Sequence, residues 1–188
     1  MRKIKTKEDY EKKKKRNQII VGVVLILLMI LSSAGYAFQS YDGSSQKTIN
    51  YNGYNFIGQN GAWNVLVGNN QFNFVYNPKQ TEVIDGNFDK IDSYYNQTIY
   101  IYSQSANAES EIRDNLGKVA YQIENACPIG IDCPEGYVKK GCENRFIIIT
   151  ENEQNVRQDS GCVYIQGDKS ELIRLTDAFL FKILKINS

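Results

Sequence analysis

Hydrophobic and polar positions divide the chain into parts with three different patterns. Residues 19–38, IIVGVVLILLMILSSAGYAF, form an uncharged stretch of twenty residues. Residues 48–76 alternate between apolar and polar positions, and two later segments repeat apolar residues at spacings of three and four. Long uncharged stretches are typical of transmembrane helices, alternation is typical of strands, and the wider spacing is typical of helices.

The uncharged stretch predicts a single transmembrane helix over residues 19–38. At 1.5 Å per residue, twenty helical residues match the roughly 30 Å hydrocarbon core of a bilayer. The run KKKKR at 12–16 precedes the stretch, and Lys47 is the first basic residue after it. The positive-inside rule therefore places residues 1–18, a basic tail, in the cytoplasm and the remainder outside the cell membrane.

A cleavable signal peptide is the alternative interpretation of this stretch. Its densest apolar part, residues 19–31, is thirteen residues long and is followed by small residues, as in signal peptides. An uncleaved signal-anchor is favoured because Tyr36 and Phe38 add aromatic residues of the kind found at membrane interfaces. Residues 39–47 are small and polar and predict a flexible tether, so both interpretations export a domain over 48–188.

The exported domain is predicted to contain a mostly antiparallel sheet of about five to seven strands. The first three strands are separated by breaks rich in Asn and Gly, which supply the positive φ that tight hairpins need. The expected strands lie at 54–56, 63–67, 72–76, 98–102, 146–150 and 162–165, with a short edge strand at 81–84.

Two helices are predicted to pack on one face of this sheet. The first is capped by Ser105, and its apolar stripe consists of Ala108, Ile112, Leu116, Val119 and Ile123. The last helix begins at Asp168, which has capping-box spacing to Glu171, and continues to about Ile186. Apolar residues cover about half of its circumference, so the expected fold class is α+β.

Four cysteines, Cys127, Cys133, Cys142 and Cys162, all follow the uncharged stretch. An even number suits pairing in an oxidising compartment, and no C-x-x-C spacing indicates a redox site or a zinc ribbon. A hairpin that turns near Asn152 places Cys142 opposite Cys162, which leaves Cys127 to pair with Cys133. Two other connectivities remain open.

Composition and charge exclude several functional classes. The chain has no histidine, which rules out Ser-His and Cys-His catalysis and every metal site that contains histidine. Outside the basic tail the net charge is −5, which is unsuited to binding nucleic acid. Residues 85–89, DGNFD, imitate half of a calcium loop, but Lys90 and Asn96 replace the required Gly and Glu. No catalytic, metal-binding or cofactor-binding residue is therefore assigned.

Two features indicate contacts outside the cell. Asn96-Gln97-Thr98 satisfies the pattern for N-glycosylation at Asn96. Tyr100 and Tyr102 alternate with Ile99 and Ile101, so we expect the two tyrosines to form a binding surface on the outer face of their strand.

The segments GAWNVLVGNNQFNFVYNP at 61–78, CENRFIIIT at 142–150 and CVYIQGDKSELIRLTDAFLFKIL at 162–184 resemble uncharacterised single-pass, membrane-anchored proteins of small-genome archaea. The resemblance covers most of the exported domain. It implies a location at the membrane, and that group has no activity to carry over.

The expected function is a membrane-anchored, extracytoplasmic interaction module without catalytic activity. Its expected partners are the lipid bilayer, through the transmembrane helix, and another envelope protein or a glycan. The first alternative is a carboxylate-based extracellular hydrolase, which requires two acids about 5 to 10 Å apart in a cleft. The second alternative is an accessory subunit of a larger membrane complex.

Overall fold

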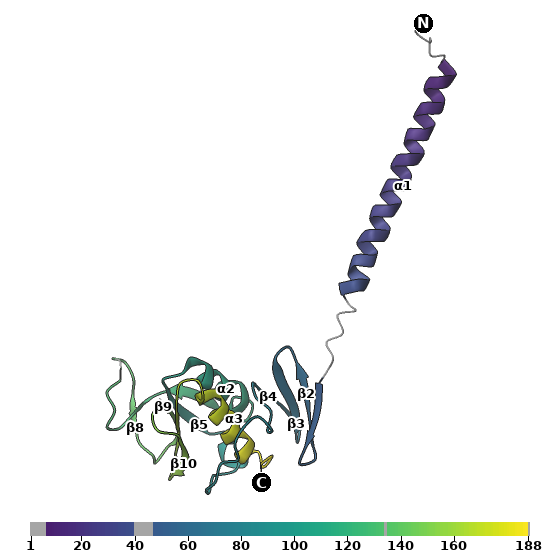
Figure 1. The fold of residues 1–188 in the computed structure, drawn as a ribbon. Coiled ribbons are helices and arrows are strands. Elements are labelled where there is room, and N and C mark those ends of the chain that lie inside the picture. The colour runs from purple at the N-terminus through teal and green to yellow at the C-terminus, as the bar shows by residue number, and fades with distance from the viewer. Residues whose placement is uncertain (1–6, 40–46, 134, 188) are drawn as a thin grey trace. The chain divides into compact units, whose positions relative to one another are not determined.

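The computed structural model describes residues 7–39, 47–133 and 135–187. The chain divides into two units, Met1–Ser45 and Gln46–Ser188 (Figure 1). The first unit contains helix α1 (Lys7–Gln39), and the second contains all strands and the other helices. Parts of the predicted tail and tether, residues 1–6 and 40–46, lie outside the described residues.

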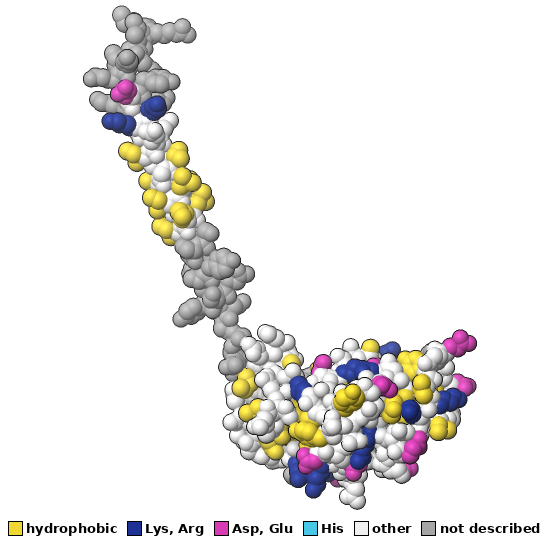
Figure 2. All heavy atoms as spheres, turned by 180° about the vertical axis from the view of Figure 1, so that it is seen from behind, with side chains coloured by type: hydrophobic (Ala, Val, Ile, Leu, Met, Phe, Trp, Pro, Cys, Tyr) yellow, Lys and Arg dark blue, Asp and Glu magenta, His cyan; other side chains and the backbone are white. Residues whose placement is uncertain are grey.

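The prediction of a transmembrane helix over residues 19–38 is wrong. Within the described part of the chain, no helix is both long enough and apolar enough to cross a bilayer. In α1 the densest apolar run, residues 19–31, is thirteen residues long and spans about 20 Å, against the roughly 30 Å that a bilayer core requires. The exposed apolar side chains of α1 form the yellow band in Figure 2.

The second unit begins with an antiparallel meander of four strands. These strands are β1 (Lys47–Tyr51), β2 (Tyr54–Gln59), β3 (Ala62–Val67) and β4 (Asn70–Phe74), which pair in this order. The turn between β2 and β3 has positive φ at Asn60 and Gly61, as a tight hairpin requires. Phe56, Val65 and Phe72 point into the core, so the alternation and the hairpins predicted for this region are confirmed.

The other large sheet is mostly parallel, which corrects the prediction of one mostly antiparallel sheet. Its strands are β5 (Thr98–Ser103), β6 (Gln122–Asn125), β9 (Arg145–Glu151), β10 (Asn155–Asp159) and β11 (Cys162–Gly167), in the order β10-β11-β9-β5-β6. Only β10 and β11 are antiparallel. Helix α2 (Ala106–Leu116) connects β5 to β6, and a helical crossover returns the chain in the same direction.

The predicted hairpin between residues 146–150 and 162–165 is also wrong. The chain forms β10 after β9 and before β11. Strand β10 runs antiparallel to β11, so β11 has the same direction as β9 and pairs with it in parallel, with Cys162 opposite Phe146. Residues 81–84 form no strand. Two short strands that the sequence did not predict, β7 (Cys127–Pro128) and β8 (Lys139–Lys140), pair with each other.

Helices α2 and α3 (Leu172–Ile183) contact both sheets rather than one face of a single sheet (Figure 1). Helix α3 contacts β9 and β11 on one side, and its Phe181 packs against Phe56 and Phe74 of the meander on the other. Thr176 and Asp177 of α3 are therefore fully buried. The α+β class is confirmed, but the helices form a middle layer between two sheets.

The helix ends differ from the prediction in two places. Ser105 caps α2 by accepting a hydrogen bond from Ala108 N at 3.4 Å, as predicted. Helix α2 ends at Leu116, and Ile123, predicted to be its last apolar contact, lies in β6. Helix α3 begins after Glu171 without a side-chain cap, so the capping box at Asp168 does not form.

Candidate functional site

The outer face of the mostly parallel sheet carries a cluster of aromatic side chains. Ile99 and Ile101 of β5 are buried in the main core, so Tyr100 and Tyr102 lie on the opposite face, as their alternation predicted. The strand register places Tyr164 of β11 on the same face, in the row of Ile148 and Tyr102. We call this surface the tyrosine face and define it by Tyr100, Tyr102, Phe146, Ile148, Cys162 and Tyr164.

Two cations lie against rings of the tyrosine face. The Nζ of Lys140 is 4.5 Å from the ring centroid of Tyr100, and the Cζ of Arg157 is 4.0 Å from that of Tyr164. Such contacts are attractive because the ring face carries partial negative charge. Tyr100 and Tyr102 are both half-buried, so this face presents tyrosine rings together with cations rather than bare rings.

A disulfide joins the amino ends of two neighbouring parallel strands of this sheet. Cys142 precedes β9 and Cys162 begins β11, with their Cα atoms 4.8 Å apart. The second disulfide, Cys127–Cys133, lies in the loop that carries β7 and β8. Both disulfides are the pairings that the sequence favoured, but Cys142–Cys162 joins two parallel strands rather than the two strands of a hairpin.

Removing the Cys142–Cys162 disulfide is expected to lower the free energy of unfolding by about 3 kcal/mol, because a cross-link restricts the unfolded chain. The double variant Cys142→Ser/Cys162→Ser avoids an unpaired thiol, and urea unfolding measures the loss. The matched control, Cys127→Ser/Cys133→Ser, opens a loop with a separation of 6 rather than 20 residues and is expected to cost less. An equal or larger loss in the control contradicts the prediction.

A polar hollow of about 700 Å³ adjoins the tyrosine face. It lies at the amino ends of β5, β9 and β11, because Thr98, Arg145 and Gly161 all line it. Tyr100 lines the hollow and also belongs to the tyrosine face, so the two surfaces are continuous. Asn96, the predicted glycosylation residue, lines it as well.

An ion pair fixes one wall of the polar hollow. Arg145 pairs with the Oδ2 of Asp89, which also accepts a hydrogen bond from Gln158 Nε2 at 2.7 Å. Partial burial raises the pKa of Asp89, but the hydrogen bond from Gln158 and the charge of Arg145 outweigh it, so the pKa lies below its usual range. Asp89 is thus held as a carboxylate.

Two carboxyl groups, those of Glu111 and Asp177, are buried on the helices, and no pattern in the sequence predicted their burial. The Oδ2 of Asp177 on α3 accepts a hydrogen bond from Tyr76 N at 2.7 Å, and Oδ1 has no donor among the described residues. Burial, followed by the neighbouring Glu111 of α2, raises the pKa of Asp177 well above its ordinary value. The pKa of Glu111 is raised too, chiefly by burial. Two adjacent buried carboxyls resist ionising together, so we expect the pair to hold one proton, which would satisfy the Oδ1 of Asp177.

Asn115, one turn after Glu111, extends this buried polar cluster to the meander. Its Oδ1 accepts from Asn73 N at 2.9 Å, and its Nδ2 donates to Asn73 O at 2.7 Å. The Asn115 side chain thus hydrogen-bonds the backbone N–H and C=O of Asn73 at the edge of β4, as a neighbouring strand would. Glu111, Asn115 and Asp177 therefore join the helices to the meander and are not open to a ligand.

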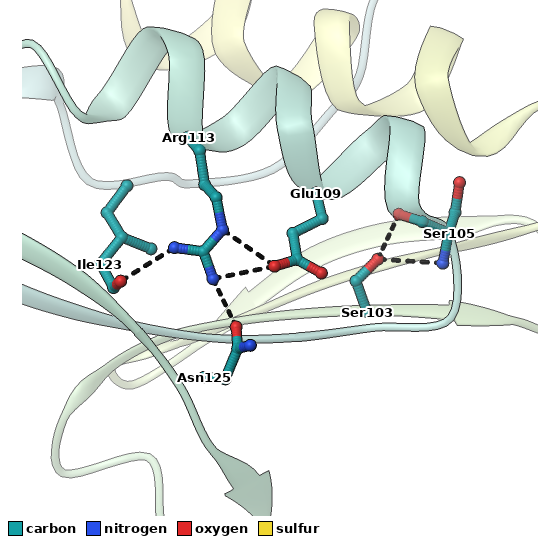
Figure 3. Close-up of polar contacts among 6 residues, drawn as sticks. All are labelled: Ser103, Ser105, Glu109, Arg113, Ile123 and Asn125. Carbon is teal, nitrogen blue, oxygen red and sulfur yellow. Dashed lines mark hydrogen bonds and ion pairs between the residues drawn. The ribbon is translucent and has the colours of Figure 1, made fainter.

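A second polar cluster, formed by other side chains of α2, is also structural (Figure 3). Arg113 donates to Glu109 Oε1 at 2.8 Å, to Ile123 O at 2.9 Å and to Asn125. Its guanidinium is thus bonded on three sides and ties α2 to β6. In the described part of the chain, no group of three His, Cys, Asp or Glu residues is arranged to hold a metal ion.

Sequence reasoning identified Asn96, Tyr100 and Cys142, which the structure brings together around the polar hollow. It missed Asp89 and Arg145, which are 56 residues apart and meet only through the fold. Comparisons with known protein families, with curated proteins and with solved structures find no match.

Proposed function

We propose that the second unit is an extracytoplasmic binding module and that its ligand is a glycan. Export is supported by the two disulfides, which use all four cysteines of the chain and persist in oxidising compartments. Binding is supported by the continuity between the polar hollow and the tyrosine face through Tyr100. This continuity is the observation that carries the proposal.

The groups around the hollow match the chemistry of a sugar. Tyr100 offers a ring with a hydroxyl, Asn144 offers an amide, and the Asp89–Arg145 pair offers an acceptor and donors held in place. Beside the tyrosine face, Gln166 donates from Nε2 to Thr150 Oγ1 at 3.3 Å and adds polar surface. A ligand that presents many hydroxyl groups and only small apolar faces fits such a surface.

Glycan binding is tested with the full-length protein on an array of polysaccharides from the envelope of the cells that produce it. We expect Tyr100→Ala and Asn144→Ala to weaken binding about tenfold or more, equivalent to about 1.4 kcal/mol. The control Tyr121→Ala, whose side chain is 70% exposed and lines neither surface, is expected to bind normally. Melting temperatures verify that the variants fold. Absence of binding, or equal binding by all variants, rejects the proposal.

Export is tested separately by thiol labelling of intact cells before and after reduction. Export requires that external thiols become reactive only after reduction, because all four cysteines are paired. Labelling that occurs without reduction, and only after cell lysis, would place the domain in the cytoplasm.

A protein partner is the second candidate, including the larger complex in which the chain would be an accessory subunit. It is favoured by the loop closed by the Cys127–Cys133 disulfide and its continuation to β8, where Ile129 is 70% and Val138 61% exposed. Exposed apolar side chains on a loop held by a disulfide are typical of sites that contact another protein. Crosslinking in intact cells that recovers a partner through this loop, together with absence of glycan binding, would favour this candidate.

The carboxylate-based hydrolase has less support. Asp89 and Glu143 both line the polar hollow, but a glycosidase needs one carboxyl with a raised pKa as its general acid. The pKa of Asp89 is lowered. The carboxyls with raised pKa values, Glu111 and Asp177, are buried between the helices and the meander.

A further inference from the structure

Asn96 begins the only Asn-x-Ser/Thr triplet of the chain, Asn96-Gln97-Thr98, despite the many asparagines. It follows the 3₁₀ helix η1 (Ile91–Tyr94) and precedes β5. Its φ of 54° lies in the left-handed region, which Asn tolerates better than most residues. The triplet therefore lies at a turn where the chain enters the sheet.

The Asn96 side chain is available for modification in the folded protein. It is exposed, and within the described residues its amide makes no hydrogen bond. The backbone is fixed independently, because Asn96 N donates to Val119 O at 2.9 Å. Asn96 lines the open polar hollow, so a group attached to its side-chain nitrogen would lie at that hollow without breaking a contact that the fold uses.

Two exposed tyrosines adjoin this position. Tyr95 precedes Asn96 and is 48% exposed, and Tyr121 is 70% exposed. The N–H of Tyr121 donates to Gln97 O at 2.9 Å, which holds its backbone beside the triplet. The hydroxyl of Tyr95 accepts a hydrogen bond from Asn70 Nδ2 at 3.1 Å, which holds this ring at the surface. Exposed aromatic rings near the triplet offer contact area to a sugar attached to Asn96.

We propose that Asn96 is N-glycosylated after export. In this step the Asn96 side-chain nitrogen bonds to the anomeric carbon of a sugar carried on a lipid diphosphate. The nitrogen loses one proton, and the lipid diphosphate leaves. The inference rests on the export proposed above, because the Asn-x-Ser/Thr acceptor is modified on surface loops of secreted proteins.

Intact mass measured on full-length protein purified from the cells that produce it naturally tests the inference. We expect a mass above that of the chain by at least one sugar residue, and loss of this excess in Asn96→Gln. Thr98→Val, which removes the required hydroxyl and leaves Asn96 in place, is expected to lose the excess as well. Thr98→Ser, which keeps a hydroxyl, is expected to retain it.

Asn60→Gln is the matched control. Asn60 is also exposed at a turn, with φ of 53°, but lacks Ser or Thr two positions later, so the excess mass is expected to remain. An unmodified wild-type mass, or an excess that survives Thr98→Val, overturns the inference. If thiol labelling shows export while the mass is unmodified, the glycosylation inference alone fails.

Discussion

Replacing Asp177 with alanine is expected to lower the free energy of unfolding by about 3 to 5 kcal/mol. Burying a carboxyl group is itself costly, but removing one partner of a buried, hydrogen-bonded pair costs more. The substitution removes the acceptor of Tyr76 N, leaves the Glu111 carboxyl without its partner and opens a cavity between α3 and the meander. Urea unfolding at neutral pH measures the loss. A decrease below about 1 kcal/mol would contradict the importance of the pair.

Asp177→Asn is the control, because it keeps the shape of the side chain and removes its ionisation. The pKa values of Asp177 and Glu111 are raised in the folded state, so the folded protein retains protons that the unfolded chain releases. The contribution of this pair to stability is therefore expected to be fully present below the ordinary carboxyl pKa and to be lost as pH rises through the raised pKa values. The asparagine variant is expected to show a weaker fall. Identical pH profiles for the two proteins would exclude the shared proton.

Short-range patterns predicted the local elements of the second unit well. Hairpin turns at positions such as Asn60-Gly61 depend on backbone angles that only a few residues adopt readily. The alternation of Ile99, Tyr100, Ile101 and Tyr102 determined which side of β5 faces the core. Both effects act between residues adjacent in the sequence, so neither requires knowledge of the rest of the fold.

Sheet topology was not predictable in the same way. The strand at 155–159 alternates weakly, as Asn-Val-Arg-Gln-Asp, because it lies at an edge and buries little. Because this strand was not predicted, β9 and β11 were expected to follow one another as an antiparallel hairpin, whereas they pair in parallel. The Cys142–Cys162 pairing was nevertheless obtained, because both residues lie at the same end of the sheet in either arrangement.

The three-layer arrangement explains why the burial of Asp177 on α3 was not predicted. The apolar side of α3, on which Thr176 lies, indicated packing against one sheet, and Asp177 is not a residue type that extends such a stripe. The meander covers the other side of the helix, so Thr176 donates to Leu172 O at 2.7 Å and Asp177 accepts from the backbone after β4. The Asp89–Arg145 pair was hidden for a similar reason, because its partners are joined only by tertiary structure.

Phe181→Ala is expected to cost about 3 to 5 kcal/mol and to loosen the meander selectively. The ring of Phe181 is fully buried, 4.5 Å from the centroid of Phe74 and 5.8 Å from that of Phe56. It is therefore the main aromatic contact between α3 and the first sheet. Amide hydrogen exchange, which reports local opening, is expected to accelerate in β2 and β4 more than in β9.

Phe179→Ala separates this local effect from a general loss of stability. Phe179 is also fully buried on α3, but its aromatic contact is Phe88, at 5.9 Å, in the segment between the two sheets. A similar decrease in unfolding free energy is expected, without preferential exchange in the meander. If both variants accelerate exchange equally in all strands, the second unit unfolds as a single cooperative body and the meander has no separate opening. If only Phe181→Ala accelerates exchange in β2 and β4, the contact of Phe181 with Phe56 and Phe74 holds the meander on the helices.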